Sequence, residues 1–213
     1  MSFAKITSPM RIDILNYGLG NISSIANMLR KLAVEFRVIC TPEDVRASEK
    51  IIIPGVGSFD HGMMGLQNAG IIQPLNEAVC IRKIPVLGIC LGMQLLCNKS
   101  EEGILPGLGW IDADVKRFCF PAHSPLKIPH MGWNTVEVTG KNNLILNKNQ
   151  EIRYYFVHSY HVVCKNPENI LATTDHGCKV TAAVNFENIY GVQFHPEKSH
   201  IFGMELLKNF SKV

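Results

Sequence analysis

One cysteine lies in a setting that favours nucleophilic chemistry. Cys90 follows the apolar run 86–89 and has Gly88 two positions before it and Gly92 two positions after it. Glycines at these positions remove side chains that would clash in a sharp turn from a strand into a helix, the arrangement called a nucleophile elbow. A helix N-terminus also stabilises a thiolate, the reactive form of cysteine. Cys90 is therefore a candidate covalent catalyst, and a buried structural cysteine is the competing interpretation of this segment alone.

A histidine and a glutamate near the C-terminus supply the other groups that such chemistry needs. Residues two apart on an extended strand point to the same side, so His195 and Glu197 are expected to be neighbours. The carboxylate can accept the Nδ1 proton of the imidazole and leave Nε2 facing a thiol. Taken alone, His-x-Glu better fits a surface salt bridge or half of a metal site. Together with Cys90 it predicts a Cys–His–Glu triad.

The first half of the chain predicts a scaffold of alternating strands and helices. Strands are expected at 11–15, 36–39, 50–53 and 85–88, and helices after Asn21 as a cap residue, near 60–68 and over 71–83. This alternation implies a largely parallel sheet covered on both faces. From Trp110 onward the pattern changes to short β-like runs, and an amphipathic helix is expected at 202–210. The predicted fold class is α/β, a mostly parallel central sheet flanked by helices with a β-rich second half.

Length and hydrophobic content fit a single domain. The chain has 213 residues, of which 46% are hydrophobic, and this is enough for one substantial core. We expect one domain over residues 10–213, preceded by an N-terminal extension at residues 1–9. No apolar run approaches the roughly 20 residues that a membrane-spanning helix needs, and the N-terminus lacks the apolar core of a signal peptide.

Charge and cysteine usage exclude several classes of protein. The net charge is only +3, and the basic residues are not interleaved with aromatic ones, so nucleic-acid binding is not expected. Seven irregularly spaced cysteines without a Cys-x-x-Cys pair argue against a zinc ribbon and a secreted disulfide scaffold. Reduced thiols indicate the cytoplasm. His158 and His161 are three apart, which places them on opposite faces of a strand, so we expect no metal site.

Two glycine-rich segments invite a nucleotide- or phosphate-binding interpretation but lack the residues it requires. After Gly18 and Gly20, Ser23 stands where a dinucleotide fingerprint has its third glycine, and no acidic residue ends the second strand. Segment 55–58 is not followed by Gly-Lys-Ser/Thr, so it lacks the lysine and the magnesium-holding hydroxyl of a Walker loop. We expect this segment to line a catalytic pocket, and no cofactor is predicted.

The motifs together resemble a known family. Segments 88–94 and 191–197 are similar to the class I glutamine amidotransferases, whose triad is cysteine, histidine and glutamate in that chain order. Further blocks resemble one branch, the glutaminase subunits of imidazole glycerol phosphate synthases; they lie at 16–21, 54–57, 129–134, 156–160 and 195–199. The resemblance runs from near residue 12 to near residue 210, which is essentially one whole domain.

This resemblance implies hydrolysis of glutamine through a cysteine thioester. Cys90 would attack the side-chain carboxamide, and His195 would protonate the departing ammonia and later activate water. Glu197 would orient His195. The backbone N–H of Leu91, directly after the nucleophile, is the natural first oxyanion donor. By resemblance, Val56 and Gly57 contribute the second oxyanion donor, and the amino-acid end of glutamine is held by Gln94, Ser159 and Tyr160.

A glutaminase of this kind needs a second active site, because free ammonia is lost as ammonium at neutral pH. The resemblance implies a heterodimer with a (β/α)-barrel cyclase that makes imidazole glycerol phosphate and aminoimidazole carboxamide ribonucleotide in histidine biosynthesis. In the resembling family the pocket mouth faces that cyclase. The residues expected at this interface are Asn16, Tyr17, Trp133, His161 and Lys198.

Two departures from the family pattern leave other functions open. Asn16 stands where an aspartate is usual, and His161 where a second tyrosine is usual. They would suit a paralogue that supplies ammonia to a sugar amidotransferase in surface-polysaccharide synthesis. A cysteine hydrolase or protease with the same elbow, or a non-catalytic regulatory subunit, are alternatives of another class. The His-x-Glu order and Gln94 favour a glutaminase over a protease, and the intact triad disfavours a silent subunit.

Overall fold

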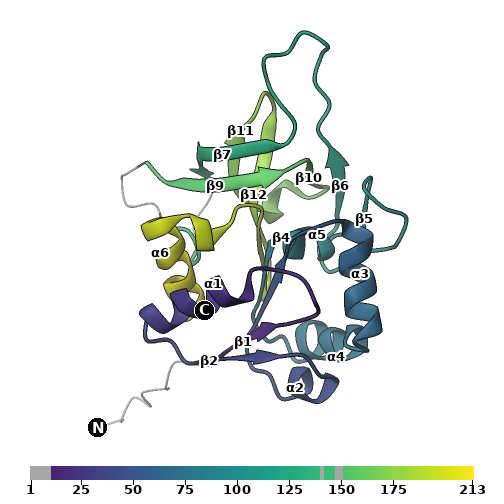
Figure 1. Cartoon of the computed structure of the whole chain (residues 1–213), viewed down its shortest axis with the longest axis vertical. Helices are drawn as coiled ribbons and strands as arrows, with labels where there is room; N and C mark the ends of the chain where they lie inside the picture. Colours follow the sequence, from purple (N-terminus) through teal and green to yellow (C-terminus); the bar gives the residue numbers. More distant parts are fainter. Residues whose placement is uncertain (1–10, 140–141, 147–150) are drawn as a thin grey trace.

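The computed structural model describes residues 11–139, 142–146 and 151–213, so the extension expected at residues 1–9 lies outside the described residues. Within these ranges a sheet of eight strands crosses the molecule (Figure 1). In spatial order its strands are β2 (Phe36–Ile39), β1 (Ile12–Leu15), β3 (Ile51–Gly55), β4 (Val86–Cys90), β13 (Ile189–Val192), β12 (Lys179–Phe186), β11 (Ile170–Asp175) and β8 (Glu137–Val138).

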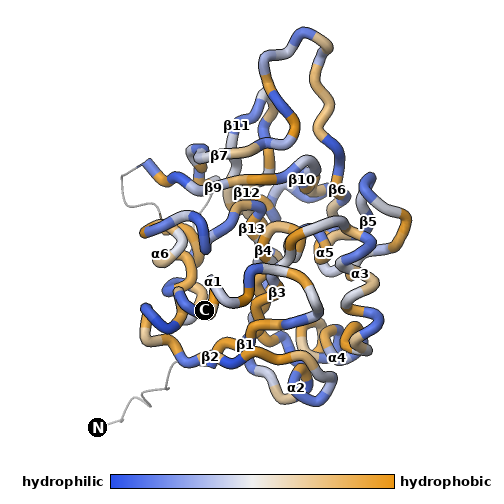
Figure 2. The backbone as a smooth tube through the Cα atoms, viewed as in Figure 1, coloured by the Kyte–Doolittle hydropathy of each residue, from blue (hydrophilic) through white to orange (hydrophobic). Residues whose placement is uncertain are grey.

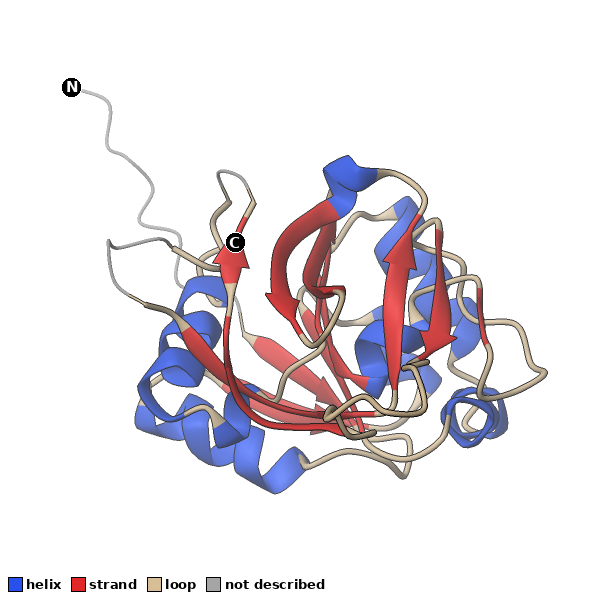
Figure 3. Cartoon of the chain, turned by 90° about the horizontal axis from the view of Figure 1, so that it is seen from above, coloured by secondary structure: helices blue, strands red, loops and turns tan. Residues whose placement is uncertain are grey.

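The sheet changes direction at β13. The strands from β2 to β13 pair in parallel, whereas β12, β11 and β8 continue the sheet in antiparallel fashion. Helices lie on both faces of the parallel part, as Figure 3 shows from above. They are α1 (Ile22–Lys31), α2 (Pro42–Arg46), α3 (Phe59–Asn68), α4 (Ile72–Asn76), α5 (Leu91–Leu95) and α6 (His200–Phe210). The expected α/β class, with a β-rich second half, is confirmed.

Two smaller sheets lie beside the large one and form one wall of the cavity described in the next subsection. β10 (Tyr160–Cys164), β6 (Ala113–Arg117) and β5 (Lys99–Ser100) make one of them. β7 (His130–Thr135) and β9 (Arg153–His158) make the other, in antiparallel register. Among the described residues, no helix is long and apolar enough to cross a membrane.

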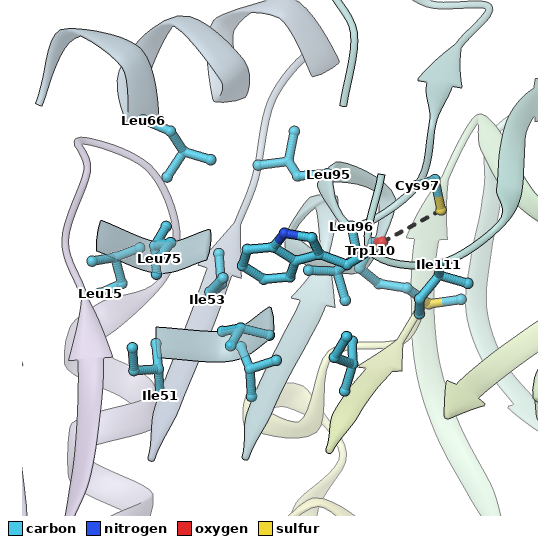
Figure 4. Close-up of a cluster of buried hydrophobic side chains, with 14 of the residues drawn as sticks. Leu15, Ile51, Ile53, Leu66, Leu75, Leu95, Leu96, Cys97, Trp110 and Ile111 are labelled. Carbon is cyan, nitrogen blue, oxygen red and sulfur yellow. Dashed lines mark hydrogen bonds between the residues drawn. The ribbon is translucent and has the colours of Figure 1, made fainter. Parts of the chain in front are cut away.

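The core has two parts, one on each face of the sheet, and the apolar stretches follow the central strands (Figure 2). The part under α3, α4 and α5 surrounds Trp110, whose ring lies among leucine and isoleucine side chains (Figure 4). Its indole Nε1–H donates to Asn76 Oδ1 over 2.7 Å, which satisfies the only polar atom of that ring. The other part lies between the sheet, α1 and α6. Both faces are therefore closed by helices, as a buried parallel sheet requires.

Glycines shape the turn from β4 into α5. Cys90 itself has φ 55° and ψ −109°, a left-handed backbone that is rare for a residue with a side chain. A Cβ on Gly88 would lie 2.7 Å from the backbone of Gly92, and a Cβ on Gly92 only 1.9 Å from the carbonyl oxygen of Ile53. The predicted nucleophile elbow is thus present, and its glycines let α5 lie directly against β3.

Some local expectations need correction. Asn21 precedes α1, but its side chain makes no capping hydrogen bond. α2 was not expected, because five residues give no periodic pattern; Thr41 caps it by accepting a bond from Asp44 N–H. The helix expected over 71–83 is α4 followed by a π-helical turn at Glu77–Ile81.

A buried lysine fixes the C-terminal helix. Lys50 is fully buried, and its Nζ donates to the carbonyl oxygens of Phe210, Ser211 and Val213 over 2.9, 3.0 and 2.7 Å. These carbonyls at the end of α6 have no partner within the helix, so the ammonium caps them. Burial lowers the pKa of Lys50 to about 8. This anchor matters for the predicted site because α6 begins at His200, shortly after His195 and Glu197.

Replacing Gly92 with alanine should destabilise the protein by at least about 2 kcal/mol, because the new methyl group meets backbone that cannot move aside. The measurement is the free energy of unfolding in urea. Gly62→Ala in α3 is the matched control: its Cβ meets side-chain methyl groups alone, those of Leu95 at 3.0 and 3.1 Å and one of Leu91 at 3.3 Å, and the alanine gains helix propensity. Equal stability of the two variants would contradict the close approach of α5 to β3.

Candidate active site

A cavity of about 340 Å³ opens at the C-terminal ends of β3 and β4. This is the edge of a parallel sheet at which ligand sites usually form. Glu197 lies outside its lining, while Cys90, His195 and all the expected oxyanion and substrate residues line it. The lining residues are Val56, Gly57, Cys90, Leu91, Gln94, Glu102, Pro129, Val157, His158, Ser159, Tyr160, His195 and Lys198.

His195 and Glu197 form a buried pair. The distance from Nδ1 to Glu197 Oε1 is 2.8 Å, and each side chain is only 3% exposed. An ionised carboxylate can only accept, so Nδ1 carries the proton and Nε2 is left for another partner. His195 and Glu197 were expected to be neighbours because they would lie two apart on a strand. They are neighbours, but the reason is wrong: β13 ends at Val192, and Pro196–Lys198 form a 3₁₀ turn.

Backbone contacts hold this turn in place. The N–H of His195 donates to Tyr155 O over 2.9 Å, and its carbonyl accepts from the Ser199 hydroxyl over 2.6 Å. The same hydroxyl accepts from Tyr155 N–H over 3.0 Å. The imidazole is therefore fixed to β9 on one side and to the start of α6 on the other.

The charge of His195 is set by its two partners. Burial would lower the pKa of this imidazole, but hydrogen bonds to Cys90 and Glu197 outweigh burial and raise it to about 10. His195 is therefore an imidazolium at neutral pH. An imidazolium beside a cysteine sulfur is the arrangement that stabilises the thiolate in cysteine nucleophiles.

A second polar group reaches the sulfur. Gln193 is fully buried, and its Nε2 donates to Cys90 Sγ over 3.8 Å. Sheet register explains the contact, because Val192 on β13 lies opposite Ile89 on β4 and each of these residues directly precedes one partner. Sequence reasoning missed Gln193, since the parallel neighbour of β4 is not evident before the topology is known.

Two backbone segments of the cavity lining lie next to Cys90. Leu91 N–H is at the first position of α5, where no helical acceptor exists. Gly55 lies opposite Cys90 in the pairing of β3 with β4, so Val56 and Gly57 follow directly beside the nucleophile. Gly57 has φ 112°, which favours glycine. α5 has only five residues, so its first amides matter more than the dipole of a long helix.

Glu102 is a pocket residue that sequence reasoning also missed. Its carboxylate lines the cavity, and Oε2 accepts from Phe59 N–H at the start of α3 over 2.9 Å. Burial raises its pKa, against the hydrogen bond from Phe59. The neighbouring Glu101 instead accepts from Arg117 N–H and Lys116 Nζ outside the cavity. Nothing in the sequence separates these two glutamates.

The residues expected at a partner interface are scattered. Lys198 lines the cavity, with its Nζ 5.5 Å from the centre of the Tyr155 ring. Trp133 is 41% exposed and stacks on His200, and Asn16 is exposed. His161 is half-buried and stacks on Phe118. For these four residues the interface role stays a prediction.

Tyr17 departs from the expectation. Its side chain is only 6% exposed, and its hydroxyl donates to Pro54 O over 2.7 Å, one residue before Gly55. A side chain buried under the end of β3 is not available to a partner surface. Burial, and then the charge of Cys90, raise its pKa above its usual range. Tyr17 therefore supports the strand that carries Val56 and Gly57.

Comparison with known proteins gives consistent matches. The sequence profile of the family described as Glutamine amidotransferase class-I matches residues 13–213. The chain is 52% identical to "Imidazole glycerol phosphate synthase subunit HisH 2" of Methanococcus maripaludis, covering 94% of this chain and 98% of that protein. It is 48% identical to the subunit of the same name from Pseudomonas aeruginosa, covering 95% and 99%.

Solved structures show the same fold at low sequence identity. "Structure of PurLQS from Thermotoga maritima" aligns with a TM-score of 0.72 at 17% identity, covering 96% of this chain and 99% of that one. "Crystal structure of glutamine amidotransferase" aligns with a TM-score of 0.71 at 20% identity, covering 95% and 99%.

Glu197→Gln and Cys90→Ala should each lower the pKa of His195 from about 10 towards the ordinary value of 6.5, because each removes one partner that favours the imidazolium. The measurement is an NMR titration of the His195 ring in the parent and both variants. An unchanged His195 curve in both variants would refute the assigned pairing.

Proposed function

Because the chain belongs to the glutamine amidotransferase class-I family, we propose that it hydrolyses glutamine to glutamate and ammonia and passes the ammonia to a synthase partner. The observation that carries this proposal is that Cys90 and His195 line one cavity and that Glu197 pairs with His195 behind it. Relatives named as subunits of imidazole glycerol phosphate synthase support the cyclase of that enzyme as the partner, and histidine biosynthesis as the pathway. The product of the pair is imidazole glycerol phosphate, with aminoimidazole carboxamide ribonucleotide released.

The first half of the reaction forms a thioester. The Cys90 sulfur attacks the side-chain carboxamide carbon, and the C–S bond forms as the carbonyl oxygen becomes an oxyanion. Leu91 N–H and the segment of Val56 and Gly57 stabilise that oxygen. The proton of the His195 imidazolium goes to the departing nitrogen, so the C–N bond breaks and ammonia leaves.

The second half regenerates the enzyme. His195, now neutral, takes a proton from water, and the hydroxide attacks the thioester carbon. The same donors stabilise the second oxyanion. The C–S bond breaks, glutamate leaves, and Cys90 and His195 return to their paired state. Glutamine and water are consumed, and glutamate and ammonia are formed, so the atoms balance.

The amino-acid end of glutamine carries one positive and one negative group. The Glu102 carboxylate is the acceptor we assign to the α-ammonium, because it lies in the cavity lining and keeps only one hydrogen bond, to Phe59. Ser159 and Tyr160 line the wall and offer backbone groups to the α-carboxylate. Gln94 anchors this wall by donating to Tyr160 O over 3.1 Å.

A second candidate function keeps the reaction and changes the acceptor. Two relatives are numbered as second HisH subunits, which is the naming expected where an organism has more than one copy. This favours keeping the alternative that the chain is a paralogue that supplies ammonia to a sugar amidotransferase.

We place the protein in the cytoplasm, and seven unpaired cysteines support a reducing compartment.

Glu102→Gln should raise the KM for glutamine about 10- to 100-fold with a smaller change in kcat, because a charged hydrogen bond to the α-ammonium is lost. The amide oxygen introduced at position 102 can still accept from Phe59 N–H, so the N-terminus of α3 keeps its cap. The measurement is glutamate release at varied glutamine. Glu101→Gln on the same loop is the control and should keep the parental KM; equal effects of the two changes would remove Glu102 from the substrate site.

Cys90→Ala should abolish glutamine-dependent product formation by the reconstituted cyclase pair and leave ammonium-dependent formation unchanged. The cyclase active site performs its own chemistry, so added ammonium bypasses the lost nucleophile. Cys97→Ala is the matched control, since Cys97 is buried outside the cavity. If the cognate cyclase neither binds the parent chain nor uses its ammonia, histidine biosynthesis is rejected and the paralogue is favoured.

A further inference from the structure

A row of buried polar side chains connects β7 with the wall of the cavity. His130 on β7 lies opposite His158 on β9, and His130 Nδ1 is 3.0 Å from His158 Nε2. His158 Nδ1 is 2.8 Å from Tyr160 O. At the other end, Asn134 Nδ2 is 3.1 Å from His130 Nε2. Both histidines are nearly inaccessible, at 4% and 6% exposure.

Chemistry gives each hydrogen bond in this row one direction. A carbonyl oxygen can only accept, so His158 Nδ1 carries the hydrogen and donates to Tyr160 O. A neutral imidazole then has Nε2 as its acceptor, and His130 Nδ1–H donates to it. His130 Nε2 therefore accepts from the amide of Asn134, whose NH₂ also donates to Asp175 O over 2.7 Å. Every donor meets an acceptor in one arrangement only.

This arrangement requires both imidazoles to be neutral. A proton added to His158 Nε2 would face the Nδ1–H of His130, leaving two donors against each other. Burial first, and then the nearby His176 ring, which is stacked 4.2 Å from His130, lower the pKa of His130 to about 4 and that of His158 to about 3. The row is therefore intact throughout the physiological pH range.

A second row meets the first at the same carbonyl. Gln94 Nε2 donates to Tyr160 O and also to Gln193 Oε1, both over 3.1 Å. Gln193 Nε2 in turn donates to Cys90 Sγ. Tyr160 O thus receives one bond from Gln94, on the side of Cys90, and one from His158 on β9. Neither ring nitrogen of His158 is free to act on a substrate, although the residue lines the cavity.

We propose that His158 is a positioning residue: supported by His130, it fixes the Tyr160 carbonyl and thereby the segment of Ser159 and Tyr160 that holds the amino-acid end of glutamine. The inference rests on the proposed glutaminase function. It assigns the effect to Nδ1 of His158, since of the two ring nitrogens of this residue only Nδ1 bonds the carbonyl. Losing this donor removes one of the two hydrogen bonds that fix the Tyr160 carbonyl. It leaves the triad of Cys90, His195 and Glu197 unchanged.

Two amide substitutions separate the ring nitrogens of His158. The amide of His158→Asn takes the place of Nδ1 and can still donate to Tyr160 O, whereas the amide of His158→Gln takes the place of Nε2 and cannot. His158→Gln should raise the KM for glutamine about tenfold with kcat within about threefold of the parent. His158→Asn should lose clearly less. His176→Asn, in the same cluster but outside the row, is the control and should keep the parental KM.

Two measurements remove folding and reactivity as explanations. Thermal unfolding checks that each variant is folded, and the rate of Cys90 alkylation by iodoacetamide, which needs no substrate wall, should match the parent. Independently of activity, ¹⁵N NMR of the parent should show both His130 and His158 protonated at Nδ1 only. Other tautomers would overturn the inference.

The outcomes distinguish the two levels of the argument. A parent chain that releases no glutamate, alone or with the cyclase, overturns the proposed function and this inference with it. A parent that hydrolyses glutamine, with equal KM values for His158→Asn and His158→Gln, overturns only the positioning role. A fall in kcat without a rise in KM overturns it as well, because the defect would then lie in the chemical step.

Discussion

The site depends on one strained residue held by close backbone packing. Cys90 has a left-handed backbone, and such a conformation costs about 1–3 kcal/mol and persists only where the surroundings impose it. Here Gly92 lets the first turn of α5 rest on the carbonyl of Ile53, and β3 and β13 pair with β4 on both sides. The sulfur therefore lies at the edge of the parallel sheet, beside the segments that follow β3 and β4.

Two kinds of histidine share this site, and their environments explain the difference. His195 is buried beside a carboxylate and a sulfur, which hold it charged, with a pKa of about 10. His158 is equally buried but meets only a carbonyl and another imidazole, so burial keeps it neutral, with a pKa of about 3. His195 keeps Nε2 for the reacting groups and can give and take a proton there, whereas both ring nitrogens of His158 are engaged in hydrogen bonds, so this side chain can only hold a geometry. Chemistry and positioning are thus divided between identical side chains by their partners.

Sequence patterns predicted the parts of the site that are local. The glycines around Cys90 and the spacing of His195 and Glu197 carry their meaning within a few residues. The expectation that His195 and Glu197 meet because they lie on a strand was nevertheless wrong, because a 3₁₀ turn replaces the strand there. Gln193, Glu102 and the row through His158 depend on which strands become neighbours, and periodicity does not determine this. Tyr17 was assigned to a surface because a motif does not show burial.

The triad reduces to one long-range requirement. His195 and Glu197 are joined within a single turn, which Tyr155 and Ser199 hold through backbone bonds. Only Cys90 arrives from a distant part of the sequence, and the pairing of β13 with β4 brings it there. Gln193, directly after β13, bonds both Gln94 and the Cys90 sulfur. These two hydrogen bonds fix the position of the segment after β13 relative to the segment after β4. Loosening this pairing would separate nucleophile from base while leaving the His195–Glu197 pair intact. In the proposed mechanism, the parallel register at β13 is therefore as much a part of the catalytic apparatus as the three side chains that it aligns.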